Sequence, residues 1–128
     1  MAKNNELTLR QKIASMLMFG FRGADVEDQG VLEIVDDIGK LGLGGVLLFG
    51  YNINFPEQLK NLTNLLLQAD SKLLIAIDQE GGRVQRLSSK NGFKNFDTAK
   101  KIAASYSSEE AYSTYLNMAK ILKDYGIN

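Results

Sequence analysis

Two patterns of apolar positions alternate along the chain, short unbroken runs and longer segments with helical spacing. The runs at 16–21, 46–49 and 73–77 predict three strands, and the five apolar residues at 73–77 are typical of a parallel strand that is covered on both faces. Between them, segments 25–40 and 56–69 carry apolar residues at three- and four-residue intervals, which predicts helices. This alternation indicates an α/β fold built from strand–helix–strand units.

Further helices are predicted on either side of these units. Residues 8–16 have helical spacing with Thr8 as the cap, and two more helices are predicted over 97–105 and 108–124.

The third predicted strand ends abruptly in a polar loop. Its sequence, Asp-Gln-Glu-Gly-Gly-Arg-Val-Gln-Arg at residues 78–86, holds two carboxylates, two glycines and two arginines. In parallel α/β sheets and barrels, ligands bind at the carboxyl ends of the strands. Asp78 at this end can accept hydrogen bonds from the hydroxyls of a ligand, or it can pair with Arg83 within the loop. The position alone leaves both roles open.

The loop at residues 78–86 resembles the glycoside hydrolase family 3 catalytic barrel, specifically its β-N-acetylhexosaminidase branch. Segments 7–21 and 44–52 are similar to the opening helix and first two strands of that family. Because the family continues from a similar Gly-Ile-Asn into a strand, the resemblance also implies that Ile127–Asn128 begins a fourth strand. The resemblance implies that residues 1–128 are a partial family 3 N-terminal domain. Its expected fold is α/β, the amino-terminal part of a (β/α)8 TIM barrel, incomplete, with about three parallel strands and covering helices. A complete barrel takes about 250 residues, so at most about half of one is expected here.

The candidate substrate-binding residues are Asp78, Glu80 and Arg83. The resemblance implies that Asp78 binds hydroxyls of the sugar in the cleavage subsite. Glu80 is not expected to form a catalytic pair with Asp78, because both would approach the sugar ring from one side and cleavage needs groups on opposing faces. We expect Glu80 to pair with Arg83 or Arg86 and so hold the loop. The two arginines could face an anionic substrate instead, but structural ion pairing is favoured.

Residues near the second strand add weaker candidates. Tyr51 and Asn52 follow that strand and either line the site or are simply polar residues of an exposed loop.

No catalytic residue and no metal ligand is assigned in this chain. The resemblance implies retaining hydrolysis of terminal β-linked N-acetylglucosamine by an aspartate nucleophile and a histidine-containing acid/base dyad, all from later parts of the barrel. The chain contains no histidine and no cysteine, so the dyad has no counterpart and no recognisable metal-ligand set exists. We therefore predict that the isolated chain is catalytically inactive, and we expect no cofactor.

The net charge and the hydropathy of the sequence limit the kinds of partner and the location that we expect. Fifteen basic residues balance fifteen acidic ones, which gives no indication of a nucleic-acid or membrane-surface partner. No apolar run of roughly 18 residues occurs, and residues 1–6 lack the apolar core of a secretory signal, so a cytoplasmic location is the default prediction. The expected ligand is a carbohydrate that contains N-acetylglucosamine.

Two functions remain open. The first is a segment of a glycosidase that trims N-acetylglucosamine from peptidoglycan-derived muropeptides during cell-wall recycling, with truncation explaining the length. The second is a noncatalytic sugar-binding or interaction protein that associates with the remainder of the barrel or with a second copy, because a barrel sheet cut partway has open edges. An unrelated βαβ binding domain would require the loop match to be a coincidence and is disfavoured.

Overall fold

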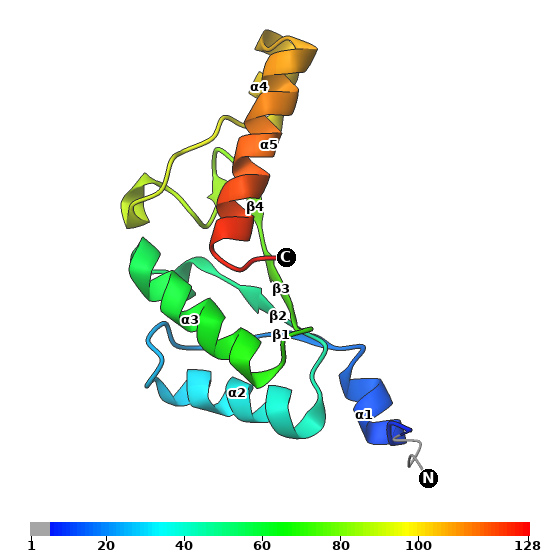
Figure 1. Cartoon of the computed structure of the whole chain (residues 1–128). Coiled ribbons are helices and arrows are strands. Elements are labelled where there is room, and N and C mark those ends of the chain that lie inside the picture. The colour runs from blue at the N-terminus through cyan, green and yellow to red at the C-terminus, as the bar shows by residue number, and fades with distance from the viewer. Residues whose placement is uncertain (1–5) are drawn as a thin grey trace.

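The computed structural model describes residues 6–128. The first five residues, on which the prediction of an absent secretory signal partly depends, lie outside this range. Three parallel strands form one sheet in the order β1-β2-β3 (Figure 1). Their bounds are Met18–Gly20 for β1, Gly45–Leu48 for β2 and Leu74–Ile77 for β3. Each strand pairs with the next one along the chain, which is the arrangement expected of successive strand–helix–strand units.

Two helices cover one face of this sheet, α2 (Gln29–Leu41) and α3 (Pro56–Ala69), as Figure 1 shows. α3 begins with Pro56 in its first turn, where the missing N–H has no helical partner to lose. α2 ends at Gly42, whose φ of 73° is a left-handed conformation that favours glycine. The core contains Val46, Leu48 and Ile75 from the strands, Val31, Ile34 and Ile38 from α2, and Leu59, Leu62 and Leu66 from α3. Truncating one such leucine to alanine typically costs about 2–5 kcal/mol, so this layer accounts for much of the stability.

The opposite face of the sheet is apolar and partly exposed. Met18 and Leu74 occupy one row of this face with Gly45 between them, and their side chains are 42% and 55% exposed. The helix α1 (Leu9–Ala14) leads into β1 and leaves Leu9 and Ile13 exposed.

The prediction for the first strand was partly wrong. A strand over 16–21 was expected, whereas β1 has only three residues, all of them exposed. The reason is its position, because β1 pairs with β2 on one side and has no paired neighbour on the other among the described residues.

The segment after β3 forms a hairpin where a loop was predicted. β4 (Gln79–Gly81) and β5 (Val84–Gln85) pair in an antiparallel ladder. Gly81 and Gly82 have φ values of 88° and 62°, so both glycines adopt the left-handed backbone that the turn requires. A short 3-10 helix, η2 (Ser89–Asn91), follows.

Two further helices, α4 (Ala99–Ser105) and α5 (Ser108–Asp124), confirm the predicted ones. Figure 1 shows α4 and the first half of α5 extending away from the sheet. After α5 the chain returns to β3, where the backbone N–H of Asn128 donates to the Ile75 carbonyl at 3.2 Å. No strand forms at the predicted fourth position, but the Asn128 side chain accepts a hydrogen bond from the Ile75 N–H in β3 and donates one to the Leu73 carbonyl just before β3. Among residues 6–128, no helix has the length and apolarity needed to cross a membrane.

Candidate functional site

The loops after the three parallel strands meet at one edge of the sheet, because parallel strands all point their carboxyl ends the same way. These loops comprise residues 21–28 after β1, residues 49–55 after β2 and the hairpin at 79–85 after β3. Asp78 lies directly between β3 and this hairpin. The sequence-based placement of Asp78 at a strand's carboxyl end is therefore correct.

Asp78 forms an ion pair with Arg86. The Arg86 Nη2 donates to the Asp78 Oδ2 at 3.0 Å, and the two side chains are 28% and 46% exposed. The hairpin register explains this partner, because Gln79 pairs with Gln85 and the next position outward sets Asp78 across from Arg86. The arginine therefore holds one carboxylate oxygen, while nearly half of the Asp78 side chain remains open to solvent.

Glu80 and Arg83, the other two substrate-binding candidates, lie on the same hairpin and are exposed. The expected pairing of Glu80 with Arg83 or Arg86 is wrong, because within residues 6–128 Asp78 is the only acidic partner of Arg86 and Glu80 forms no ion pair. A register shift between Gln79 and Gly81 displaces Glu80 from the regular ladder, so no arginine stands opposite it. Asp78 and Arg86 are brought together, whereas Glu80 and Arg83 are left at the hairpin surface.

Two glutamines fix the hairpin to the segment that follows it. The Gln79 side chain bonds both backbone groups of Leu87, donating to its oxygen at 2.8 Å and accepting from its N–H at 3.0 Å. The Gln85 oxygen accepts from the Phe96 N–H at 3.0 Å, and its nitrogen donates to the Gly82 carbonyl. Sequence reasoning missed these contacts, although the Gly-Gly pair between two short runs is a recognised hairpin signal.

Asn52 joins the first two loops and is completely buried. Its Nδ2 donates to the carbonyls of Phe21 and Gly23 at 3.1 and 2.6 Å, and its Oδ1 accepts from the Phe49 N–H at 2.8 Å. Asn52 is thus neither a lining residue of the site nor an exposed loop residue, the two roles considered from sequence. It ties the loop after β1 to the 3-10 turn η1 (Gly50–Asn52) after β2.

Aromatic rings and guanidinium groups stack along the same edge. The Phe49 and Tyr51 rings lie 5.4 Å apart between centroids and are nearly parallel, at 14°. The Arg22 guanidinium lies 4.3 Å from the Tyr51 centroid, and that of Arg86 lies 6.0 Å from the Phe49 centroid. One continuous series of contacts therefore runs through Arg22, Tyr51, Phe49 and Arg86 and ends at Asp78, and its members come from the segments after all three strands.

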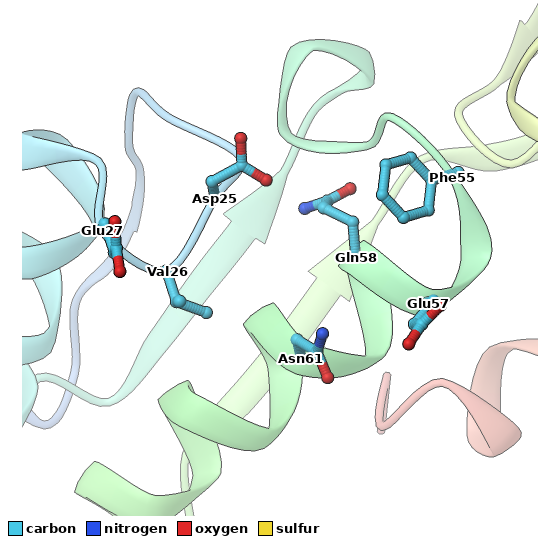
Figure 2. A pocket seen from close by; sticks show the side chains of 7 residues that line it. All are labelled: Asp25, Val26, Glu27, Phe55, Glu57, Gln58 and Asn61. Atoms are coloured by element: carbon cyan, nitrogen blue, oxygen red, sulfur yellow. The ribbon is translucent and has the colours of Figure 1, made fainter.

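A separate hollow of about 510 Å³ lies where α2 and α3 begin (Figure 2). It is lined by Asp25, Val26, Glu27, Phe55, Glu57, Gln58 and Asn61. No residue of the 78–86 segment lines this hollow, so it is distinct from the Asp78 site. In the part of the chain that the structure describes, no cluster of three or more Asp or Glu side chains could hold a metal ion, and the hollow's carboxylates are no exception.

The family model described as "Glycosyl hydrolase family 3 N terminal domain" matches residues 8–128. This chain belongs to glycoside hydrolase family 3. The family assignment made from the 78–86 loop is thereby confirmed, and the three parallel strands with their helices are the amino-terminal part of the family 3 barrel.

The chain is also similar to named β-hexosaminidases and to a solved family 3 structure. A "Beta-hexosaminidase" of Pseudomonas aeruginosa is 35% identical over 95 residues, which cover 74% of this chain and 26% of the relative. "Beta-hexosaminidase A" of Pseudoalteromonas piscicida is 32% identical over an alignment covering 95% of this chain and 24% of that protein. The solved structure of a family 3 β-N-acetylglucosaminidase from Paenibacillus sp. superposes with a TM-score of 0.83 at 33% identity, covering 96% of this chain and 23% of the other. The chain therefore spans about a quarter of the length of these family 3 relatives.

Proposed function

We propose that this chain is the amino-terminal part of a retaining glycosidase that removes terminal β-linked N-acetylglucosamine, and that it contributes Asp78 as a ligand for the sugar hydroxyls. The observation that carries the proposal is the Asp78 carboxylate at the carboxyl end of β3, held on one side by Arg86 and otherwise half exposed. A fixed carboxylate that keeps open acceptor positions suits hydroxyl recognition. The relatives' names, β-hexosaminidase and β-N-acetylglucosaminidase, support this class of sugar.

Glu80 and Arg83 have a secondary place in this proposal. Both are exposed on the hairpin that begins beside Asp78, so they are available to contact a substrate farther from the sugar that Asp78 binds. A muropeptide derived from peptidoglycan would extend beyond that sugar, and we propose such a substrate, with cell-wall recycling in the cytoplasm as the setting.

The isolated chain is proposed to bind sugar without cleaving it. Double displacement requires a nucleophile and an acid/base on opposing faces of the sugar, and the residues gathered around Asp78 come from one side only. The chain also has no histidine for the acid/base of the hexosaminidase branch. Purified chain should release no nitrophenol from nitrophenyl N-acetylglucosaminide above the buffer rate, and release above it would contradict this statement.

The test of the binding role is an NMR titration of the chain with N-acetylglucosamine. We expect signals around Asp78 to shift, and Asp78→Asn to weaken binding about tenfold or more, because hydrogen bonds to a charged group are worth roughly 1.5–3 kcal/mol. Asp36→Asn is the matched control, since this carboxylate lies on the exposed face of α2 in an ion pair with Lys40. Equal affinity of Asp78→Asn and the unmutated chain would reject the role of Asp78.

A second candidate function is a noncatalytic interaction protein. The exposed Met18 and Leu74 on the uncovered sheet face favour it, together with the unpaired side of β1. The proposed partner is the remainder of the barrel or a second copy of the chain. Measuring the mass in solution by light scattering tests this second candidate, because a monomer at every concentration would argue against association of copies.

A further inference from the structure

We propose that Phe49, Tyr51 and Arg22 are positioning residues for the Asp78 site, acting on Asp78 through Arg86. This inference rests on the proposed sugar-binding role of Asp78, but it concerns residues in the loops after β1 and β2 that form no hydrogen bond or ion pair with Asp78.

The first step is the contact between Arg86 and Phe49. The Arg86 guanidinium contacts both Asp78 and Phe49. Its Nη2 lies 3.0 Å from the Asp78 Oδ2, and its Cζ lies 6.0 Å from the centroid of the Phe49 ring. The Arg86 Nε is buried and has no hydrogen-bond partner among the described residues. Because no hydrogen bond fixes the guanidinium at Nε, its orientation depends on the carboxylate and on the ring beside it.

The second step is the support of the Phe49 ring. Tyr51 stacks on it at 5.4 Å, and Arg22 packs on Tyr51 at 4.3 Å. A cation over one ring and a parallel ring beneath it are both attractive arrangements, so each member of the series restricts the next.

The third step is the anchoring of the series to the sheet. The Phe49 backbone N–H donates to the buried Asn52 side chain at 2.8 Å. Gly20 in β1 leaves the space that the ring occupies, since a Cβ at Gly20 would lie 2.7 Å from Phe49 Cε2. The ring is therefore fixed between a strand without a side chain at that position and the stacked Tyr51.

These contacts make the position of Asp78 depend on all three loops. Arg22 belongs to the loop after β1, Phe49 and Tyr51 follow β2, and Arg86 follows the hairpin after β3. Loss of the Phe49 ring should free Arg86 and, with it, the Asp78 carboxylate.

The experiment is NMR of the full chain, following the Arg86 Nε–Hε signal, which is assigned by its loss in Arg86→Lys. In the unmutated chain we expect this signal to exchange slowly with water, because the Nε is buried. Phe49→Leu keeps apolar bulk but removes the ring, so the signal should exchange as fast as that of the exposed Arg83. N-acetylglucosamine affinity should fall about fivefold, the scale of one lost cation–π contact.

Controls separate positioning from general structural damage. Phe55→Leu removes an exposed ring at the start of α3, away from the stack, and should change neither readout. Tyr51→Phe keeps the ring and should behave as the unmutated chain, whereas Tyr51→Leu should speed Arg86 exchange in the same direction as Phe49→Leu. Tyr51 is 43% exposed, so Tyr51→Leu gives the decisive result if Phe49→Leu does not fold.

The outcomes distinguish this inference from the proposed function. Faster Arg86 exchange in a chain that does not bind the sugar would support the positioning contacts and reject sugar binding. An unchanged Arg86 signal in folded Phe49→Leu, or in Tyr51→Leu where Phe49→Leu is unfolded, would overturn the positioning role whatever the sugar affinity.

Discussion

Asn52 illustrates how one buried polar side chain can organise a site that it does not enter. Its amide group makes three hydrogen bonds to backbone groups of two different loops. Burying a polar group is costly unless it is hydrogen-bonded, and both the nitrogen and the oxygen of the Asn52 amide have partners. The loops after β1 and β2 are therefore fixed relative to one another.

Replacing Asn52 should be strongly destabilising. Asn52→Ala leaves the Phe21 and Gly23 carbonyls and the Phe49 N–H without this partner, and we expect a loss of roughly 3 kcal/mol in the free energy of unfolding. Urea denaturation followed by circular dichroism measures it. Asn54→Ala, in the same loop but exposed, is the control and should change stability by less than about 0.5 kcal/mol. Similar losses in both variants would show that Asn52 has no special role.

For single residues, the sequence predicts where a side chain lies along an element better than it predicts which side chain will pair with it. Asp78 could be placed from sequence because it directly follows a continuous apolar run, and strand ends are local features. Its partner Arg86 could not, because the choice among Arg83, Arg86 and solvent depends on the register of the hairpin. Asn52 was equally hidden, since nothing local distinguishes a buried asparagine from an exposed one.

At the scale of elements, helix starts are well defined. α5 begins with a capping box in which the Ser107 hydroxyl accepts from the Glu110 N–H, and the Glu110 carboxylate accepts from the Ser107 N–H at 2.8 Å. Hydrogen bonds from Ser107, first from its backbone N–H and then from its side chain, lower the pKa of the Glu110 carboxyl below its ordinary 4.5. Hydrogen bonds from the Ala24 and Asp25 N–H groups likewise lower the pKa of Asp28, which precedes α2.

Acid should therefore destabilise the fold. Because the pKa of Glu110 is lower in the folded chain than in the unfolded chain, its contribution is complete above about pH 4.5 and is lost as the pH falls through the folded value. Unfolding free energies measured between about pH 3 and pH 6 should decrease toward acid, and Glu110→Gln should reduce that slope. Asp36→Asn removes an exposed carboxylate and serves as the control. An identical slope in Glu110→Gln would contradict the capping role.

Hydrophobic periodicity predicts the long helices of this chain well and its short strands poorly. α2, α3 and α5 have long amphipathic patterns and were predicted close to their observed bounds. β1 came out shorter than its apolar run, because part of that run joins α1 to the edge strand. The β4–β5 hairpin is too short to have a pattern of its own, so only its Gly-Gly turn could have indicated it.

For the whole molecule, the uneven covering of the sheet is the main consequence of the partial barrel. α2 and α3 bury one face, while Met18 and Leu74 lie exposed on the other. Exposed apolar surface beside the open edge of a sheet is a common cause of association.

We expect the chain to associate as its concentration rises, with a mass by light scattering above the 14.2 kDa of one copy. Leu74→Lys should shift the population toward the monomer, because a charge on the uncovered face opposes its burial. Leu32→Lys is the matched control, since Leu32 is similarly exposed but lies on α2, and it should leave association unchanged. Monomeric behaviour of the unmutated chain at high concentration would show that the uncovered face does not drive association.

The order of the sheet has a consequence for biosynthesis. Because β1 pairs with β2 and β2 with β3, every strand finds its neighbour in the segment translated just before it. Each of these pairings closes a single strand–helix–strand unit, and domains can begin to fold while synthesis continues. On a ribosome, β1, α2 and β2 could assemble before the Asp78 loop has been made, so the aromatic support for Arg86 would be in place before the arginine that it holds.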